Sequence, residues 1–173
     1  MSERADGVIL FDFEQDSGGG DWTTVDDTVM GGRSASTLEV ADGALIFSGE
    51  LSLENQGGFC SARSKTQGWD LSDFEGLAVT IRTGDRAFTL TARDETGRDA
   101  VGHHHPLPVT GDEWQTVHAL FADFEASYHG RVLEDHPGLD TSRVRSVGFL
   151  ISEQQEGDFK LEVAWIAAFD GSS

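Results

Sequence analysis

Short segments with alternating apolar and polar residues run through almost the whole chain, and they constrain its fold more than any other feature. In segment 76–83, for example, Leu77, Val79 and Ile81 occupy alternate positions, which is the repeat of a half-buried strand. Turn signals such as Asp42-Gly43 separate these segments, and Asp-Gly is typical of a tight hairpin. The predicted strands are 7–13, 34–40, 44–51, 57–64, 76–83, 86–94, 111–121, 145–152 and 159–169. The last predicts one shared face for Phe159, Leu161, Val163 and Trp165.

About eight to ten short strands with turns every 8–12 residues are typical of an all-β sandwich or barrel. One helical turn is expected around 139–145, where Asp140 or Thr141 could cap it. A chain of 173 residues without repeats or linkers is typical of one domain with a substantial core. We therefore predict a single all-β domain over residues 1–173, a jelly-roll β-sandwich.

The charge of the chain excludes some partners. Its 31 Asp and Glu outnumber its 12 Lys and Arg, for a formal net charge of −19. Nucleic acids and anionic membrane surfaces are bound by clustered Lys and Arg, so neither is an expected partner. A solvated acidic surface explains this composition, and a salt-adapted protein would carry the same kind of surface. No apolar run reaches the roughly 18 residues of a membrane span, so no membrane insertion is expected. The start of the chain resembles no targeting peptide, which predicts a cytoplasmic location.

The first motif that could bind something lies just ahead of the predicted strand at 34–40. It contains Asp26, Asp27, Met30 and the pair Gly31-Gly32. Glycines tolerate positive φ and Asp side chains bond nearby amides, so the motif can be a tight turn. Alternatively, the two carboxylates could ligate a hard cation such as Ca²⁺. Two acids fall short of the six to eight oxygens that Ca²⁺ takes, so the turn is favoured. No cofactor is predicted, and a structural cation stays the alternative.

A second motif covers residues 52–64. Asn55 ahead of Gly57-Gly58 predicts another turn, after which Phe59, Ser61 and Arg63 would share one strand face. Such a face can border a groove, or Arg63 can pair with an acid such as Glu54 or Asp27. Cys60 is the only cysteine, and we expect a buried, inert thiol.

Histidines and aromatic residues supply the remaining candidates. His103 and His105 could share a metal because alternate strand residues face the same side, but zinc-site spacing motifs are missing. Surface histidines in a loop are the favoured interpretation, and no metal site is predicted. Trp22 and Tyr128 lie in loop-like segments and could stack on a sugar, although packing in the core or at its rim is favoured.

Motifs for catalysis are missing from the sequence. The chain has no GxSxG nucleophile elbow, and its glycine-rich stretches have neither Walker nor GxGxxG spacing. With 31 acidic residues, a pair of carboxylates can be found by chance. We therefore predict a protein that is not an enzyme.

Together, three blocks of the sequence resemble the complex I intermediate-associated protein family. They are "VDDTVMGGRSAS" with the preceding Trp22, "GELSLENQGGFCSARS", and "LDTSRVRSVGFLISEQQEGDFKLEVAWI". The resemblance covers residues from about 8 to 169 and implies a galactose-binding-like jelly roll. Family positions in the first two blocks fall on Asp27, Val29, Met30, Gly31, Gly32, Ser34, Asn55, Gly57, Gly58, Phe59, Ser61 and Arg63. Those in the third fall on Phe149, Gln155, Gly157, Phe159 and Trp165.

The family is named for a mitochondrial factor that helps assemble NADH:ubiquinone oxidoreductase. The resemblance thus implies a binding or assembly module whose partner is a protein, such as a respiratory-complex subunit or intermediate. The alternative is a carbohydrate- or small-ligand-binding module that uses the concave face of a sheet. The resemblance also predicts that Asp27, Ser34, Asn55 and Arg63 come together in space.

Overall fold

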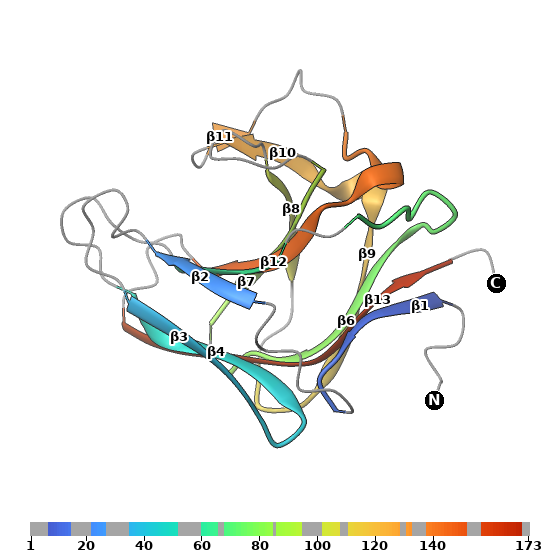
Figure 1. Cartoon of the computed structure of the whole chain (residues 1–173). Helices are drawn as coiled ribbons and strands as arrows, with labels where there is room; N and C mark the ends of the chain where they lie inside the picture. Colours follow the sequence, from blue (N-terminus) through green and yellow to red (C-terminus); the bar gives the residue numbers. More distant parts are fainter. Residues whose placement is uncertain are drawn as a thin grey trace.

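The computed structural model describes residues 7–14, 22–26, 35–51, 60–65, 68–84, 86–94, 102–107, 111–128, 131–132, 138–151 and 157–170. In these ranges the chain forms two antiparallel β-sheets packed face to face (Figure 1), which confirms the predicted sandwich. The strands are β1 (Gly7–Asp12), β2 (Trp22–Asp26), β3 (Ala35–Ala41), β4 (Ala44–Leu51), β5 (Cys60–Ser64), β6 (Gly76–Arg82), β7 (Phe88–Arg93), β8 (Gly102–Leu107), β9 (Gln115–Leu120), β10 (Glu125–Tyr128), β11 (Arg131–Val132), β12 (Ser146–Ile151) and β13 (Gly157–Phe169). The described ranges also include the 3₁₀ turns η4 (Phe121–Asp123) and η5 (Thr141–Arg143).

One sheet has six strands and the other has seven. The six-stranded sheet runs in the order β3-β4-β13-β6-β9, and β1 also pairs with β13. The long β13 pairs with β4 along 157–163 and with β1 along 165–169, so β4 and β1 follow each other along one edge of β13, and β6 pairs with its other edge. The seven-stranded sheet runs in the order β11-β10-β8-β7-β12-β5-β2. Both sheets curve in the same sense in Figure 1, and the outer face of the seven-stranded sheet is its hollow side.

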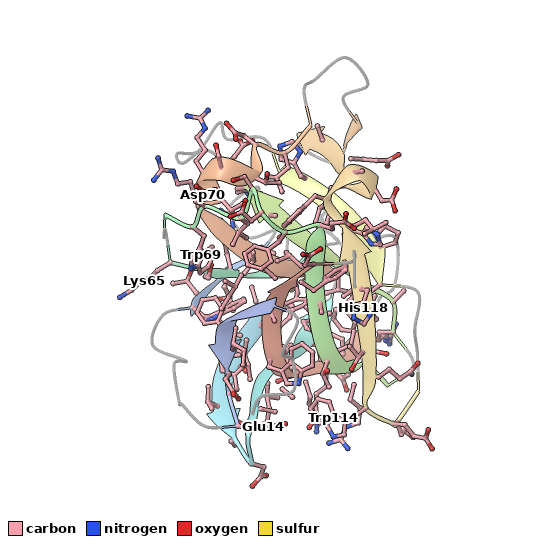
Figure 2. All side chains as sticks on the ribbon, turned by 90° about the vertical axis from the view of Figure 1, so that its right-hand side faces the viewer. Glu14, Lys65, Trp69, Asp70, Trp114 and His118 are labelled. Carbon is pink, nitrogen blue, oxygen red and sulfur yellow. The ribbon has the colours of Figure 1, made fainter. Side chains whose placement is uncertain are left out.

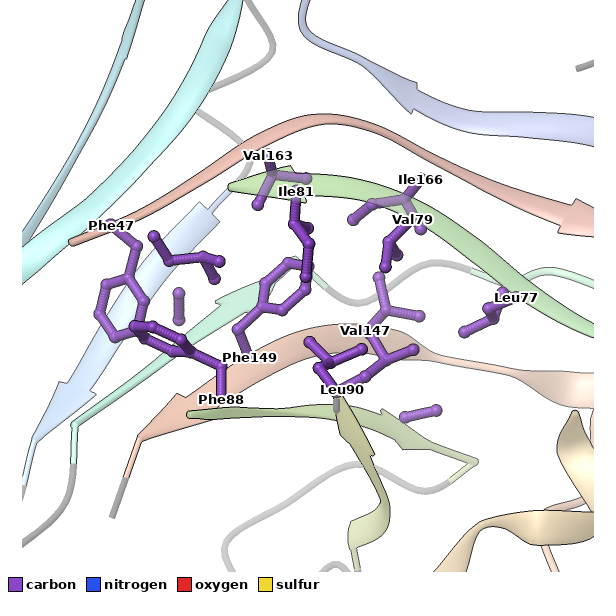
Figure 3. Close-up of a cluster of buried hydrophobic side chains, with 14 of the residues drawn as sticks. Phe47, Leu77, Val79, Ile81, Phe88, Leu90, Val147, Phe149, Val163 and Ile166 are labelled. Atoms are coloured by element: carbon purple, nitrogen blue, oxygen red, sulfur yellow. The ribbon is translucent and has the colours of Figure 1, made fainter. Parts of the chain in front are cut away.

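The core lies between the sheets and consists of alternate residues from each strand (Figure 3). On β6, Leu77, Val79 and Ile81 are fully buried, as their spacing predicted. Leu90 on β7 and Phe149 on β12 face them from the seven-stranded sheet and are also fully buried. Because inward and outward positions alternate strictly on β7 and β12, the intervening residues must face outward, away from the six-stranded sheet.

Two local predictions are confirmed. Asp42 and Gly43 both adopt positive φ, 54° and 80°, in the turn that joins β3 to β4. This is the conformation that Asp-Gly favours in a two-residue hairpin. At η5, the side chain of Asp140 accepts a hydrogen bond of 3.1 Å from the Ser142 N–H, so Asp140 is the cap.

The predicted shared face of β13 is wrong at its second half. Phe159, Leu161 and Val163 are buried, but the pairing with β6 shifts between Val163 and Trp165. This bulge inserts one residue, which reverses the alternation beyond it. Core positions consequently fall to Ile166 and Ala168, and Trp165 is only partly buried.

Gly148 on β12 is a position where the fold requires glycine. A Cβ atom there would lie 2.2 Å from the Ala62 carbonyl oxygen and 3.1 Å from Thr91 Oγ1. We expect Gly148→Ala to lower the free energy of unfolding by about 1–3 kcal/mol, because backbone of the neighbouring strand must move. Chemical denaturation measures the loss. Gly138→Ala is the matched control, since nothing lies within 4 Å of a Cβ atom there. Equal stabilities for the two variants would contradict this account.

Candidate functional site

Most residues of the predicted motif cluster lie outside the described residues. These are Asp27, Met30, Gly31, Gly32, Ser34, Asn55, Gly57 and Gly58. Asp26 is described only as the last backbone position of β2, whereas Arg63 is described in full. The convergence of Asp27, Ser34, Asn55 and Arg63 therefore stays a prediction, and so does a cation at Asp26 and Asp27.

Described residues that flank the two motifs do lie side by side. Asp26, which precedes the first motif segment, pairs with Cys60, which follows the second. Ala35, which follows the first segment, pairs with Glu50, close to the start of the second. The described residues that flank the two motifs are thus paired in the sheets at both places.

Arg63 projects from β5 onto the outer face of the seven-stranded sheet. Its neighbour Ala62 is buried in the core, so alternation places Arg63 on the opposite side. Across the strands, Arg63 is in register with Thr23 on β2 and with Gly148 on β12. The same row continues through three residues of the next strands, which are Thr91, His104 and Glu125.

A second arginine, Arg93, lies on the same face one row away. It follows Thr91 by two positions on β7 and pairs with Ser146 of β12. A Cβ atom added at Gly102 of β8 would lie 3.1 Å from Arg93 Nη2 and 3.2 Å from His104 Nε2. The absence of a side chain at Gly102 therefore lets the guanidinium and the imidazole approach each other over bare backbone.

Two guanidinium groups and one imidazole form this cluster, which we call the arginine face (Arg63, Arg93 and His104). Burial, and then the positive charge of Arg63, lowers the pKa of Arg93 to about 10. Burial, followed by the charges of Arg93 and His103, lowers the pKa of His104 to about 4. Burial also lowers the pKa of Arg63. Each shift shows that the protonated form of the group lacks compensation from the described residues around it.

Two other described arginines are paired with acids. Arg82 donates two hydrogen bonds to Glu162, of 2.8 and 2.9 Å, and Arg143 lies 3.2 Å from Asp140. Among the described residues, no carboxylate lies within ion-pair distance of Arg63 or Arg93. For a chain with net charge −19, two partly buried arginines without a described acidic partner are unexpected.

The aromatic candidates for sugar stacking have different outcomes. Trp22 is only 5% exposed and packs on Phe149, Phe11 and Phe13 in the core. It cannot stack on a ligand, and core packing, the favoured alternative, is confirmed for it. Only its expected place in a loop-like segment is wrong, because Trp22 is the first residue of β2. The side chain of Tyr128 lies outside the described residues.

The interpretation of residues 103–105 as loop histidines is wrong, because they belong to β8. His103 is fully buried on the core side, with Nε2 3.8 Å from Asp94 Oδ2. His105 faces the same side, as the alternation predicted, but its Nδ1 is hydrogen-bonded to the Pro106 carbonyl at 2.7 Å. The described residues contain no group of three or more His, Cys, Asp or Glu that could hold a metal ion. Cys60 is buried, as expected.

Trp114 is the large aromatic side chain most exposed in the described ranges, and the sequence did not single it out. It lies beside β9, near one end of the six-stranded sheet, with His118 further along (Figure 2). The guanidinium of Arg82 stacks 4.8 Å from the ring centroid and is held there by Glu162. This arrangement satisfies both the ring face and the charge, so it has a structural explanation without a ligand.

Arg93 and His104 are the residues of the arginine face that the sequence analysis missed. Alternation alone assigns each to the face opposite the core. Their meeting depends on the pairing of β7 with β8 and on Gly102, and neither is visible in the spacing of a sequence.

Comparison with known proteins identifies relatives in sequence. A family model described as Complex I intermediate-associated protein 30 matches residues 11–163. An uncharacterized protein of Schizosaccharomyces pombe is 30% identical over 93% of this chain and 83% of its own length. The mitochondrial complex I intermediate-associated protein 30 of Mus musculus is 26% identical over 93% of this chain, which spans 56% of the mouse protein.

Solved structures with the same fold include carbohydrate-binding modules. The family 11 module from Clostridium thermocellum, in complex with a β-1,3-1,4-mixed-linked tetrasaccharide, superimposes with a TM-score of 0.71. The match covers 96% of this chain and 97% of the module at 17% identity. An agarase matches with a TM-score of 0.66 over 95% of this chain and 26% of its own. These likenesses confirm the jelly-roll architecture.

The described residues include no helix with the length and hydropathy of a membrane span.

Proposed function

Because the chain belongs to the complex I intermediate-associated protein 30 family, we propose that it is a non-enzymatic binding module that contacts a protein partner during assembly of a respiratory complex. The partner is a subunit or an assembly intermediate. One observation carries this proposal: the family match runs from residue 11 to residue 163 and so includes nearly every described strand.

The outer face of the seven-stranded sheet is the contact surface that the geometry favours. It is the concave side of the sandwich (Figure 1). It carries Arg63, which belongs to the family motif. Unpaired positive charge on an otherwise acidic chain can orient a partner and select against wrong ones. Partly desolvated arginines are also frequent among the residues that dominate binding energy.

Capture from cells tests this proposal. A tagged copy of the chain, expressed in its own host, should co-purify subunits of complex I, and deletion of the gene should lower the amount of assembled complex on native gels. Arg63→Glu should abolish capture without loss of folding. Lys160→Glu is the matched control, because Lys160 is exposed on β13 in the other sheet. Failure to capture any subunit, together with normal assembly after deletion, would refute the proposal.

Carbohydrate binding is the second candidate, and it is supported by the carbohydrate-binding modules that share the fold. Sugar recognition usually places aromatic rings against the sugar, as lectin-like clefts do. The described strand side chains on the outer face of the seven-stranded sheet include no Trp, Tyr or Phe; they are Thr23, Ser61, Arg63, Thr89, Thr91, Arg93, His104, Pro106, Glu125, Ser146 and Leu150. Retardation of the protein in gels that contain mixed-linked β-glucan would place this candidate first.

A further inference from the structure

We propose that the arginine face is a binding site for an oxyanion, a carboxylate or phosphate group held between the guanidinium groups of Arg63 and Arg93. This inference gives the site a ligand chemistry. It does not depend on the partner being a respiratory-complex protein.

The register of three strands sets the spacing of the two arginines. Arg63 reaches the face from β5, opposite Gly148, and Arg93 reaches it from β7, opposite Ser146. They stand on either side of β12, so their Cα atoms are about 10 Å apart across the strands and about 7 Å apart along them. Two long side chains that lean over β12 from opposite sides can therefore converge on one small anion.

The floor between the arginines is made of backbone and small polar groups. Gly148 contributes no side chain, and Thr91 Oγ1 lies 3.1 Å from the position that a Cβ atom would take there. Thr91 and Ser146 are both buried although they face outward. A hydroxyl can donate one hydrogen bond to an anionic oxygen. The hydroxyls of the floor and the two guanidinium groups can therefore all donate hydrogen bonds to the same anion.

Energetics favour an occupant with negative charge. A guanidinium that is partly removed from water is costly unless an opposite charge compensates it, and two adjacent guanidinium groups also repel each other. Arg82 and Arg143 obtain that compensation from Glu162 and Asp140. Arg63 and Arg93 obtain none from any carboxylate that the structure describes. Arginine forks match the two oxygens of a carboxylate or phosphate, which makes an oxyanion the fitting ligand.

Titration of the purified whole chain with single anions tests the site. Sodium phosphate and sodium acetate are added separately against sodium chloride at matched ionic strength. Thermal unfolding and NMR of the arginine Nε–H and histidine ring signals are followed. We expect a saturable rise in Tm and shifts at Arg63, Arg93 and His104. Arg63→Gln and Arg93→Gln should each weaken binding by about tenfold or more, because each removes one charge-assisted pair. Arg143→Gln is the control, since that arginine is exposed and already paired with Asp140.

The response to each anion separates the sources of the ligand. A stronger response to phosphate assigns the site to a phosphate-bearing ligand, and a stronger response to acetate assigns it to a carboxylate. No response to either anion overturns the proposal, and so does binding that survives both arginine substitutions.

In chloride alone, Arg93→Gln should leave Tm unchanged or raise it, because it removes an uncompensated charge. A fall of Tm in chloride would mean that an acid of this chain, such as Asp27 or Glu54, already occupies the site, which also overturns the proposal. Capture of complex I subunits is measured in a separate experiment. Failure of anion binding therefore does not decide the proposed assembly function, and failure of capture does not decide the anion site.

Discussion

Acidification from pH 7 to pH 4 is expected to cost the fold up to about 3 kcal/mol through His104 alone. The pKa of this imidazole is lowered to about 4 in the folded chain, from 6.5 in the unfolded chain. Between pH 4 and pH 6.5, His104 is mostly protonated in the unfolded chain and mostly neutral in the folded chain. The free energy of unfolding therefore falls as the pH is lowered from about 6.5 towards 4.

The surroundings of His104 explain why its pKa is lowered. Burial is the largest cause of the shift, followed by the charges of Arg93 and His103. Thr91 on β7 is its neutral neighbour in register, and the exposed Glu125 on β10 is the acid on its other side. Burial and the positive charge of Arg93 thus outweigh one solvated carboxylate, because water screens an exposed charge far more than a buried one.

Comparison of the whole chain with His104→Gln isolates this contribution. Denaturant unfolding is measured at several pH values in buffers free of phosphate and carboxylate, and the difference between the two free energies is plotted against pH. The difference should be constant above about pH 7 and should change by up to about 3 kcal/mol by pH 4. Addition of phosphate at pH 5 should raise the apparent pKa of His104, since a bound oxyanion favours the imidazolium. A difference that is independent of pH would contradict the burial of His104.

Strands in which apolar and polar residues alternate could be predicted from the sequence. Segment 76–83 is one case, because Leu77, Val79 and Ile81 face the core at every second position. β8 was missed because it contains "HHHP", and histidine and proline carry no strand signal of their own. β13 was found, but its bulge near Ala164 depends on pairing with β6 and cannot be read from one strand.

The candidate site was predictable only in part, for a related reason. Arg63 was singled out because it belongs to a motif that is contiguous in the sequence. Arg93 and His104 were not, because a sheet brings residues together through register, and register is fixed by the partner strands. The wrong placement of Trp22 in a loop has the same origin, since the pairing of β2 with β5 makes this segment a strand and turns the Trp22 ring into the core.

Phe149→Ala is expected to be the most destabilising single substitution considered for the core, with a loss of about 3–5 kcal/mol. Phe149 lies in the core between the sheets (Figure 3) and is fully buried on β12. Its ring stacks on that of Trp22, with the ring centroids 6.1 Å apart. Removal of the ring leaves a cavity between the sheets that the surrounding strands can fill only partly. A loss of this size lowers Tm by about 6–20 °C in a domain of this length.

Leu150→Ala is the matched control for that substitution, because Leu150 is the next residue on β12 and faces outward, where it is only partly buried. Its loss should be well below half that of Phe149→Ala, since a partly exposed side chain leaves little cavity. A larger loss for Leu150→Ala than for Phe149→Ala would mean that β12 is turned the other way. Gly148 would then face the core and Arg63, its partner in register on β5, would face inward with it. The pair of variants therefore tests the stability of the core and also whether the arginine face lies on the outside of the sandwich, as both proposals require.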